Sequence, residues 1–142
     1  MKTLSVTLTA MLFVVVELAG ATEPAPIPRK AKLRKAAELV VVGDVLRVEP
    51  FGTAFTGRCN VWQYYRASVA VRSTLKGRAS STVVKVKFLR KVRGLIRCRP
   101  LHTELALTAG KRYEFYLVEH KLKYGSVYGV VSGDGVFEVE KK

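Results

Sequence analysis

The amino-acid sequence predicts an all-β domain, a small antiparallel barrel or sandwich of five or six strands. Between residues 39 and 139, short runs of β-branched and aromatic residues alternate apolar with polar positions, as half-buried strands do. Turn residues such as Gly and Pro separate these runs at short intervals. No helical pattern alternates with the runs, which argues against a parallel α/β sheet.

The first predicted strand covers residues 39–48 and is apolar on both of its faces, which is typical of a buried strand. Gly43 in its middle predicts a bulge or a sharp bend, as needed where one strand serves two sides of a barrel. Pro50 and Gly52 end this strand, and a loop that contains Cys59 follows.

The second and third strands are expected at residues 64–72 and 84–88, with a turn at Lys76-Gly77 between them. Residues 90–100 are predicted to form a basic loop. Residues 101–107 fit neither the helical nor the strand period. The remaining strands are expected at residues 113–118, 126–132 and 136–139.

Residues 1–21 have the order of features that defines a secretory signal peptide. A positive start at Met1-Lys2 precedes an apolar stretch at 4–16, and small residues at 19–21 suit a cleavage site. Glu17 is unusual in such a segment, and the alternative is a buried N-terminal strand or helix. No later stretch reaches the roughly 20 apolar residues of a membrane-spanning helix. We therefore expect an exported protein, secreted or periplasmic, with no transmembrane span after the signal is removed.

Cleavage after residue 21 would leave 121 residues that begin at Thr22, which is enough for one domain. Residues 22–36 are expected to form a Pro-rich and basic leader, and residues 37–142 the β domain. Five positive charges at 29–35 are compatible with a short helix or with a solvated basic arm.

Cys59 and Cys98 are the two cysteines of the chain. In an oxidising compartment such a pair is expected to form a disulfide, which would close a loop of about 40 residues. The cysteines and the two histidines, His102 and His120, lack the spacing of a zinc site, so no metal site is expected. Cys98 and His102 as a catalytic pair are a weaker alternative.

Three segments together resemble the OB-like barrel of netrin/TIMP-type domains and of similar small exported bacterial proteins. They are Ala37-Glu38-Leu39-Val40-Val41-Val42-Gly43-Asp44-Val45, Val69-Ala70-Val71-Arg72-Ser73-Thr74-Leu75-Lys76-Gly77 and Gly110-Lys111-Arg112-Tyr113-Glu114-Phe115-Tyr116-Leu117. The resemblance covers residues 37–139. It implies a five- to six-stranded antiparallel OB-like barrel, with one short helix as an optional addition.

The resemblance does not extend to the inhibitory mechanism of that family. Its inhibitory members present a free N-terminal cysteine to the metal ion of a protease. The mature chain is expected to begin at Thr22, and no cysteine precedes Cys59. Metalloprotease inhibition by that mechanism is therefore not expected.

The chain carries 25 Lys and Arg against 11 Asp and Glu, a net charge of +14 that the loss of residues 1–21 leaves unchanged. This excess favours an anionic partner. The candidate anion-binding residues are Arg66, Arg72, Lys85, Lys87, Arg90, Lys91, Arg93, Arg97 and Arg99. Next to them in the sequence, Trp62, Tyr64 and Tyr65 are candidates for a stacking platform. The alternative is a solvated face that keeps the protein soluble.

No nucleophile with a base, paired carboxylates or phosphate-binding loop is evident, so catalysis, a catalytic residue and a cofactor are not expected. The leading hypothesis is a non-enzymatic binding module for an anionic glycan, a lipid headgroup or an acidic protein. Nucleic acid is disfavoured, because an exported protein meets little of it. The alternative is an inhibitor or protein-interaction domain acting through its loops. A hydrolase built on His102, His120 and a carboxylate is a third, weaker hypothesis.

Overall fold

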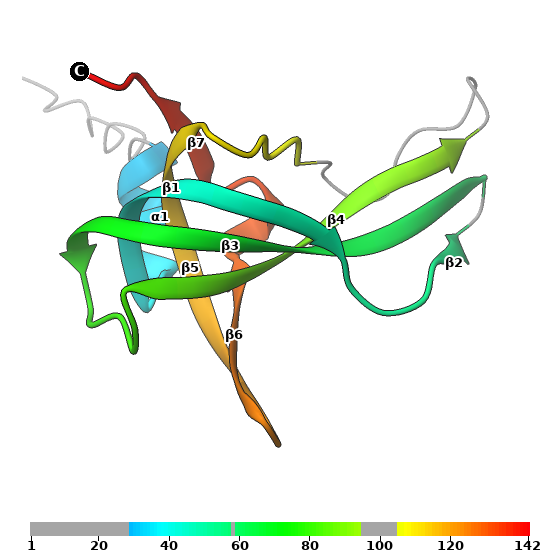
Figure 1. The fold of residues 1–142 in the computed structure, drawn as a ribbon, viewed down its shortest axis with the longest axis horizontal. Helices are drawn as coiled ribbons and strands as arrows, with labels where there is room; N and C mark the ends of the chain where they lie inside the picture. The colour runs from blue at the N-terminus through cyan, green and yellow to red at the C-terminus, as the bar shows by residue number, and fades with distance from the viewer. Residues whose placement is uncertain (1–28, 58, 95–104) are drawn as a thin grey trace, which may run out of the picture.

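The computed structural model describes residues 29–57, 59–94 and 105–142. The predicted signal peptide 1–21 and the first part of the predicted leader lie outside these residues. The described chain contains one α-helix, seven β-strands and a 3-10 turn (Figure 1). The elements are α1 (Arg29–Ala36), β1 (Leu39–Pro50), β2 (Phe55–Gly57), β3 (Asn60–Lys76), β4 (Val83–Gly94), β5 (Arg112–Leu122), β6 (Gly125–Val130), η1 (Val131–Gly133) and β7 (Val136–Val139).

All seven strands belong to one sheet, and five of them form a hydrogen-bonded ring. The ring runs β1-β3-β4-β6-β5 and returns to β1, while β2 adds to β3 and β7 adds to β5. The prediction of an all-β domain is confirmed. The prediction of a purely antiparallel sheet is wrong, because β4 and β6 run parallel. Strand directions cannot alternate all the way round a ring with an odd number of members, so at least one pair has to be parallel.

Strand β1 pairs along both of its edges and is irregular at Gly43, where the sequence predicts a bulge or a bend. Val42 pairs with Ser73 of β3 and also with Glu114 of β5. The register with β3 shifts between Val42 and Gly43. A Cβ on Gly43 would lie 2.5 Å from Val69 Cγ1 and 2.8 Å from the carbonyl oxygen of Ala70, so no larger residue fits without a backbone shift.

The core lies inside the ring and is contributed by strands far apart in the sequence. Val41, Val69, Val86, Phe115 and Leu117 are fully buried together. They come from β1, β3, β4 and β5. Phe115 and Leu117 lie two residues apart on β5, which is the alternation on which the sequence prediction rests. Burial of each such side chain contributes about 1.5–3 kcal/mol relative to exposure.

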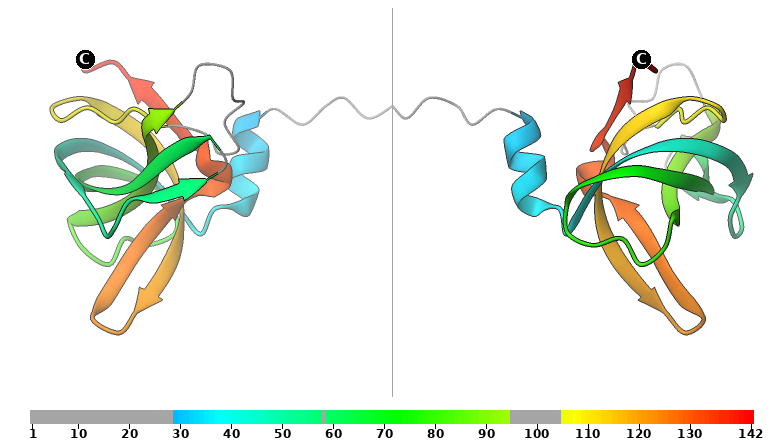
Figure 2. Two further views of the ribbon diagram at one scale, coloured as in Figure 1. Left: turned by 90° about the vertical axis from the view of Figure 1, so that its right-hand side faces the viewer. Right: turned by 60° about the vertical axis from the view of Figure 1, so that its left-hand side comes forward.

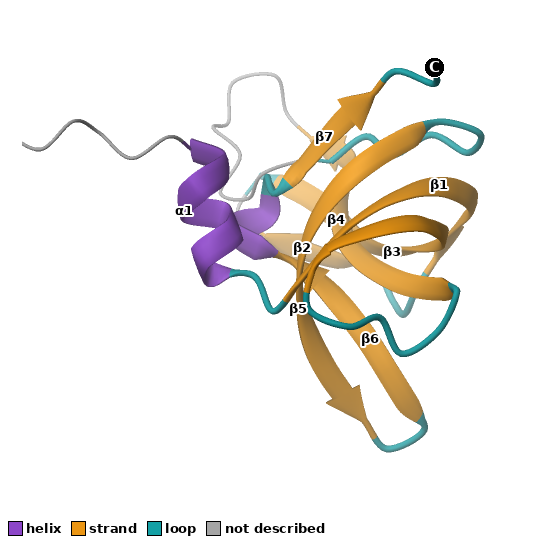
Figure 3. Ribbon diagram, turned by 90° about the vertical axis from the view of Figure 1, so that its left-hand side faces the viewer, coloured by secondary structure: helices purple, strands orange, loops and turns teal. Residues whose placement is uncertain are grey.

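Helix α1 packs against the outside of the sheet and forms a second, smaller core (Figure 3). Leu33 is its buried residue, in a cluster with Tyr116 of β5 and Val131 of η1. Lys76 at the end of β3 donates hydrogen bonds to the carbonyls of Arg34 and Ala37, which satisfies acceptors at the C-terminal end of the helix. Of the two alternatives for the basic segment, a short helix or a solvated arm, the structure shows the helix.

The strands on one side of the molecule are longer than the alternation of residues predicts. Strand β4 continues to Gly94, through residues expected to form a loop, and pairs with β3 as far as Asn60. Residues 90–94 are all exposed, so no alternation of burial marks them as a strand. With β2, these ends form an arm that extends from the ring (Figure 1). No helix in the described part of the chain is long and apolar enough to cross a membrane.

Candidate anion-binding site

The outward face of β1, β3 and β4 collects basic side chains from three neighbouring strands. Residues that pair across strands lie on the same face of a sheet. Across β3 and β4, Ser68 pairs with Lys85, Arg66 with Lys87, and Trp62 with Lys91. Across β1 and β3, Arg47 pairs with Ser68, and Glu49 with Arg66. We call this set the cationic face: Arg47, Glu49, Arg66, Lys85, Lys87 and Lys91.

Glu49 is the one carboxylate of the cationic face, and two arginines share it. Its Oε1 lies 2.7 Å from an Nη of Arg66, and its Oε2 lies 3.1 Å from an Nη of Arg47. The hydrogen bond from Arg66 is the main cause that lowers the pKa of the Glu49 carboxyl below its usual range. Lys85 donates a hydrogen bond of 2.6 Å to the hydroxyl of Ser68.

Lys87 rests on aromatic rings instead of a carboxylate. Its Nζ lies 3.9 Å from the centre of the Tyr64 ring and 5.9 Å from that of Phe51. The guanidinium of Arg66 lies 5.1 Å from the same Phe51 ring. Among the described residues Lys87 has no ion pair. Aromatic rings attract a cation without neutralising it, so the full charge of Lys87 is available to a ligand.

A cavity of about 680 Å³ opens beside Lys87. Its size falls within the range of small-molecule sites, about 300–1,000 Å³. Tyr64, Lys87, His120 and Ser132 supply the polar side chains among its described lining, and that lining contains no carboxylate. The apolar side chains of the lining are Phe51, Phe88, Leu89, Leu105, Leu122, Val127 and Val130.

Gly129 of β6 shapes the cavity by lacking a side chain. It pairs with Lys87 of β4 on one side and with Val118 of β5 on the other. A Cβ on Gly129 would lie only 2.6 Å from Nε2 of His120, so the imidazole occupies the space that a side chain would need. A glycine inside a strand often marks such a close approach, and this is the sequence signal that could have pointed to the site.

The cavity is also lined by two successive residues in the left-handed conformation. Ser132 has φ 54° and Gly133 has φ 70°. Glycine adopts this conformation freely, whereas for serine it costs about 1–2 kcal/mol. Non-glycine residues in such conformations are concentrated at ligand sites and switch regions. The sequence pattern indicates neither the left-handed conformation of Ser132 nor the place of Phe51 in the cavity lining.

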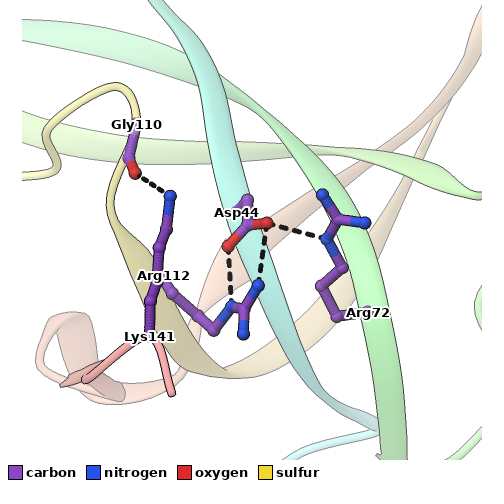
Figure 4. A network of polar contacts seen from close by, with 5 residues as sticks. All are labelled: Asp44, Arg72, Gly110, Arg112 and Lys141. Atoms are coloured by element: carbon purple, nitrogen blue, oxygen red, sulfur yellow. Dashed lines mark hydrogen bonds and ion pairs between the residues drawn. The ribbon is translucent and has the colours of Figure 1, made fainter.

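Arg72, a predicted anion-binding residue, is engaged elsewhere. It lies near the far end of β3 and binds Asp44 of β1, with 2.7 Å between Nε and Oδ2 (Figure 4). Arg112 of β5 binds the same carboxylate, with 2.8 Å from Nε to Oδ1 and 3.1 Å from an Nη to Oδ2. Arg112 first and Arg72 second hold the pKa of the Asp44 carboxyl well below its usual range. We call these three residues the Asp44 cluster.

The other predicted basic residues do not converge on one face. The guanidinium of Arg90 lies on the opposite face of β4, 5.7 Å from the centre of the Tyr65 ring. Arg93 pairs with Val61 beyond a register shift, which changes the face it presents. Lys91 belongs to the cationic face. Arg97 and Arg99 lie outside the described residues.

Of the three aromatic residues expected to form a platform, Tyr64 alone lines the cavity. Trp62 is 1% exposed, which leaves no ring surface for stacking on a partner. Tyr65 points to the core side of β3, where its ring stacks on Phe88. Adjacent residues of a strand face opposite sides, so Tyr64 and Tyr65 cannot both belong to one outward platform.

The predicted disulfide reaches beyond the described residues. Cys59 lies in the turn between β2 and β3, whereas Cys98 lies outside the described ranges. The bridge between them therefore stays a prediction. Within the described ranges, no group of three or more His, Cys, Asp and Glu side chains is arranged to hold a metal ion.

Comparison with protein-family models, with curated proteins and with solved structures finds no match for this chain. The resemblance to netrin/TIMP-type domains stays a prediction from the sequence.

Proposed function

We propose that this protein is an exported, non-enzymatic module that binds an anionic partner through the cationic face. The observation that carries the proposal is the charge balance of that face, on which five cations surround one carboxylate. Glu49 engages two of the cations, which leaves three lysines without an ion-pair partner in the described chain.

Cross-strand pairing makes this arrangement costly for the protein alone. Arg66 and Lys87 are direct partners across β3 and β4. Like charges opposite one another destabilise a sheet, and a nearby carboxylate or a bound anion offsets that repulsion. Glu49 supplies an anion for Arg66. A partner with sulfate, phosphate or carboxylate groups would supply it for the lysines.

The fold proposed for this function is an OB-like barrel. Numbered by chain order within the ring, its strands follow 1-2-3-5-4, a five-stranded arrangement with one crossover. In OB-folds the face of the second and third strands, framed by loops, is the usual ligand surface. The second and third strands of this ring are β3 and β4, which carry most of the cationic face.

The test is retention on immobilised heparin, measured as the salt concentration needed for elution. We expect the triple variant Lys85→Gln, Lys87→Gln, Lys91→Gln to elute at much lower salt. The slope of log K against log salt should fall by about 2–3, which is roughly one unit for each lysine that no longer pairs with an anion. The matched control removes three exposed lysines elsewhere, Lys32→Gln, Lys35→Gln and Lys142→Gln.

Equal losses in the two triple variants would mean that net charge alone causes retention, and the cationic face would then be only a solvated surface. A smaller loss in the face variant than in the control would place binding on α1 and the C-terminus. Either result contradicts the proposal.

The alternative function, a protein-interaction domain acting through its loops, is favoured by the β5–β6 hairpin. This hairpin projects from the ring (Figure 2), and at its tip Tyr124 is 91% exposed and Leu122 is 54% exposed. A protein partner that stays bound at high salt and is lost with Tyr124→Ser would support this alternative over the cationic face.

A further inference from the structure

We infer that the cavity beside Lys87 binds an organic anion with one acidic group on an apolar body, such as a carboxylate or sulfonate on a hydrocarbon or aromatic frame. This inference rests on the proposed function in one respect, since Lys87 also belongs to the cationic face. The partner of the face is an extended anion, whereas the ligand of the cavity is a small molecule.

The lining selects an apolar body. Seven aliphatic or phenyl side chains line the cavity, and the Tyr64 ring adds an aromatic face. Removing apolar ligand surface from water contributes about 25 cal/mol per Å². A cavity of about 680 Å³ has room for a ligand of drug or fatty-acid size. A strongly hydrated polyanion would gain nothing from such walls.

Lys87 can bind one acidic group of the ligand. It is the one Lys or Arg of the described lining, and no carboxylate lies there to compete for it. Its Nζ rests on the Tyr64 ring, which holds the ammonium at the boundary between the cavity and the cationic face. A second acidic group on the ligand would find no second cation inside the described lining.

Two further polar side chains can complete the recognition of the acid. His120 and Ser132 line the cavity, and neither forms a hydrogen bond through its side chain with the described residues. The hydroxyl of Ser132 can donate to an acid oxygen, and so can an N–H of the imidazole. Small-molecule sites combine such a few polar groups with apolar walls.

The experiment compares two fluorescent probes that share an apolar body. 1-Anilinonaphthalene-8-sulfonate carries one sulfonate, and N-phenyl-1-naphthylamine lacks it. We expect Lys87→Met to weaken the affinity for the sulfonate probe about tenfold, equivalent to about 1.4 kcal/mol. The affinity for the neutral probe should change less than about twofold. The matched control is Lys91→Met, on the same strand and the same face but outside the cavity lining, which should change both probes less than about twofold.

A second variant tests the walls without changing charge. Leu89→Trp fills the cavity from β4, and we expect it to weaken both probes at least about tenfold while retention on heparin stays unchanged. Dodecanoate should displace the sulfonate probe, and dodecanol should do so much more weakly. A cooperative thermal unfolding transition checks that each variant is folded, because partly unfolded proteins also bind the sulfonate probe.

Equal weakening of the sulfonate probe by Lys87→Met and Lys91→Met overturns the inference, since it would show attraction to the surface alone. Full binding of both probes to a folded Leu89→Trp variant overturns it as well. These results are separate from those that decide the proposed function. Heparin retention can fail to depend on the cationic face while the probes still depend on Lys87 and Leu89, and the reverse can also occur.

Discussion

The Asp44 cluster and the surroundings of Lys87 use basic residues in opposite ways. Asp44 is 7% exposed and accepts hydrogen bonds from two arginines on the strands that flank it in the ring. Lys87 packs on two rings and forms no ion pair within the described chain. The first arrangement joins β1, β3 and β5 and binds both guanidiniums to one carboxylate. The second leaves a charge beside an open cavity. The number of basic residues in this sequence therefore says little until their partners are known.

The largest expected effect is the loss of thermal stability when the buried carboxylate of Asp44 is changed. Asp44→Asn leaves the partly buried Arg112 and the more exposed Arg72 without a carboxylate. The loss of charged hydrogen bonds at a buried carboxylate is destabilising, mainly through Arg112. We expect a larger fall in melting temperature for this variant than for Glu49→Gln or Lys87→Met. Lys87→Met removes a cation that has no carboxylate partner in the described chain and that repels Arg66 across the strands, so it should not lower the melting temperature. Equal falls for Asp44→Asn and Lys87→Met would show that the comparison is wrong.

The pH dependence of stability should follow from the same carboxylate. The pKa of Asp44 in the folded protein lies below its usual value of 3.8. As the pH falls below about 4, the unfolded chain therefore takes up this proton before the folded protein does, and stability falls with pH. The lowered pKa values of Glu49 and Glu114 act in the same direction. Thermal unfolding between pH 6 and pH 2 should show this loss, and Asp44→Asn should flatten it.

An intermediate effect is expected when Glu49 is changed. Glu49→Gln removes the carboxylate that Arg47 and Arg66 share. The two guanidiniums on the cationic face then have no anion to pair with there. We expect elution from heparin at higher salt than for the unchanged protein, with a slope greater by about 1. The matched variant Glu138→Gln removes one exposed carboxylate paired with Lys111 on another part of the surface and should give a smaller gain.

The smallest expected effect concerns strain beside the cavity. Ser132→Gly relieves the left-handed conformation at φ 54° and should stabilise the protein by up to about 1 kcal/mol. Chemical denaturation measures this change. The same substitution removes the hydroxyl proposed to contact the acid, so the sulfonate probe should bind more weakly even though the protein is more stable. A gain in both stability and probe affinity would contradict the role given to Ser132.

The sequence predicted well those features that depend on residues close together in the chain. The alternation at residues 64–72 and 84–88 marks strands because one side of each packs into the core. Gly43 marks the irregularity of β1 because a side chain there would collide with Val69. Arg29 to Ala36 forms a helix whose one buried residue, Leu33, is only weakly indicated by the pattern.

Features that depend on distant partners were beyond reach. Arg72 looks like any exposed arginine of a strand until Asp44, 28 residues earlier, is brought beside it. The parallel pairing of β4 and β6 follows from ring closure and leaves no local trace. The end of β4 was missed because residues 90–94 are exposed on both faces and show no alternation. The cavity joins Phe51, Lys87 and Ser132, and no short segment contains more than one of them.

Helix α1 packs on the sheet, and this packing also sets the order in which the molecule can assemble. Its Leu33 packs on Tyr116 and Val131, and β1 just after it pairs with β5 through Leu39 and Leu117. Helix α1 and the edge of β1 that faces β5 thus find their partners only when the last third of the chain has been synthesised, whereas the other edge of β1 pairs with the nearer β3. Contacts of long sequence separation form slowly. If the protein is exported as proposed, this delay would favour closure of the ring after the chain has passed through a translocation channel.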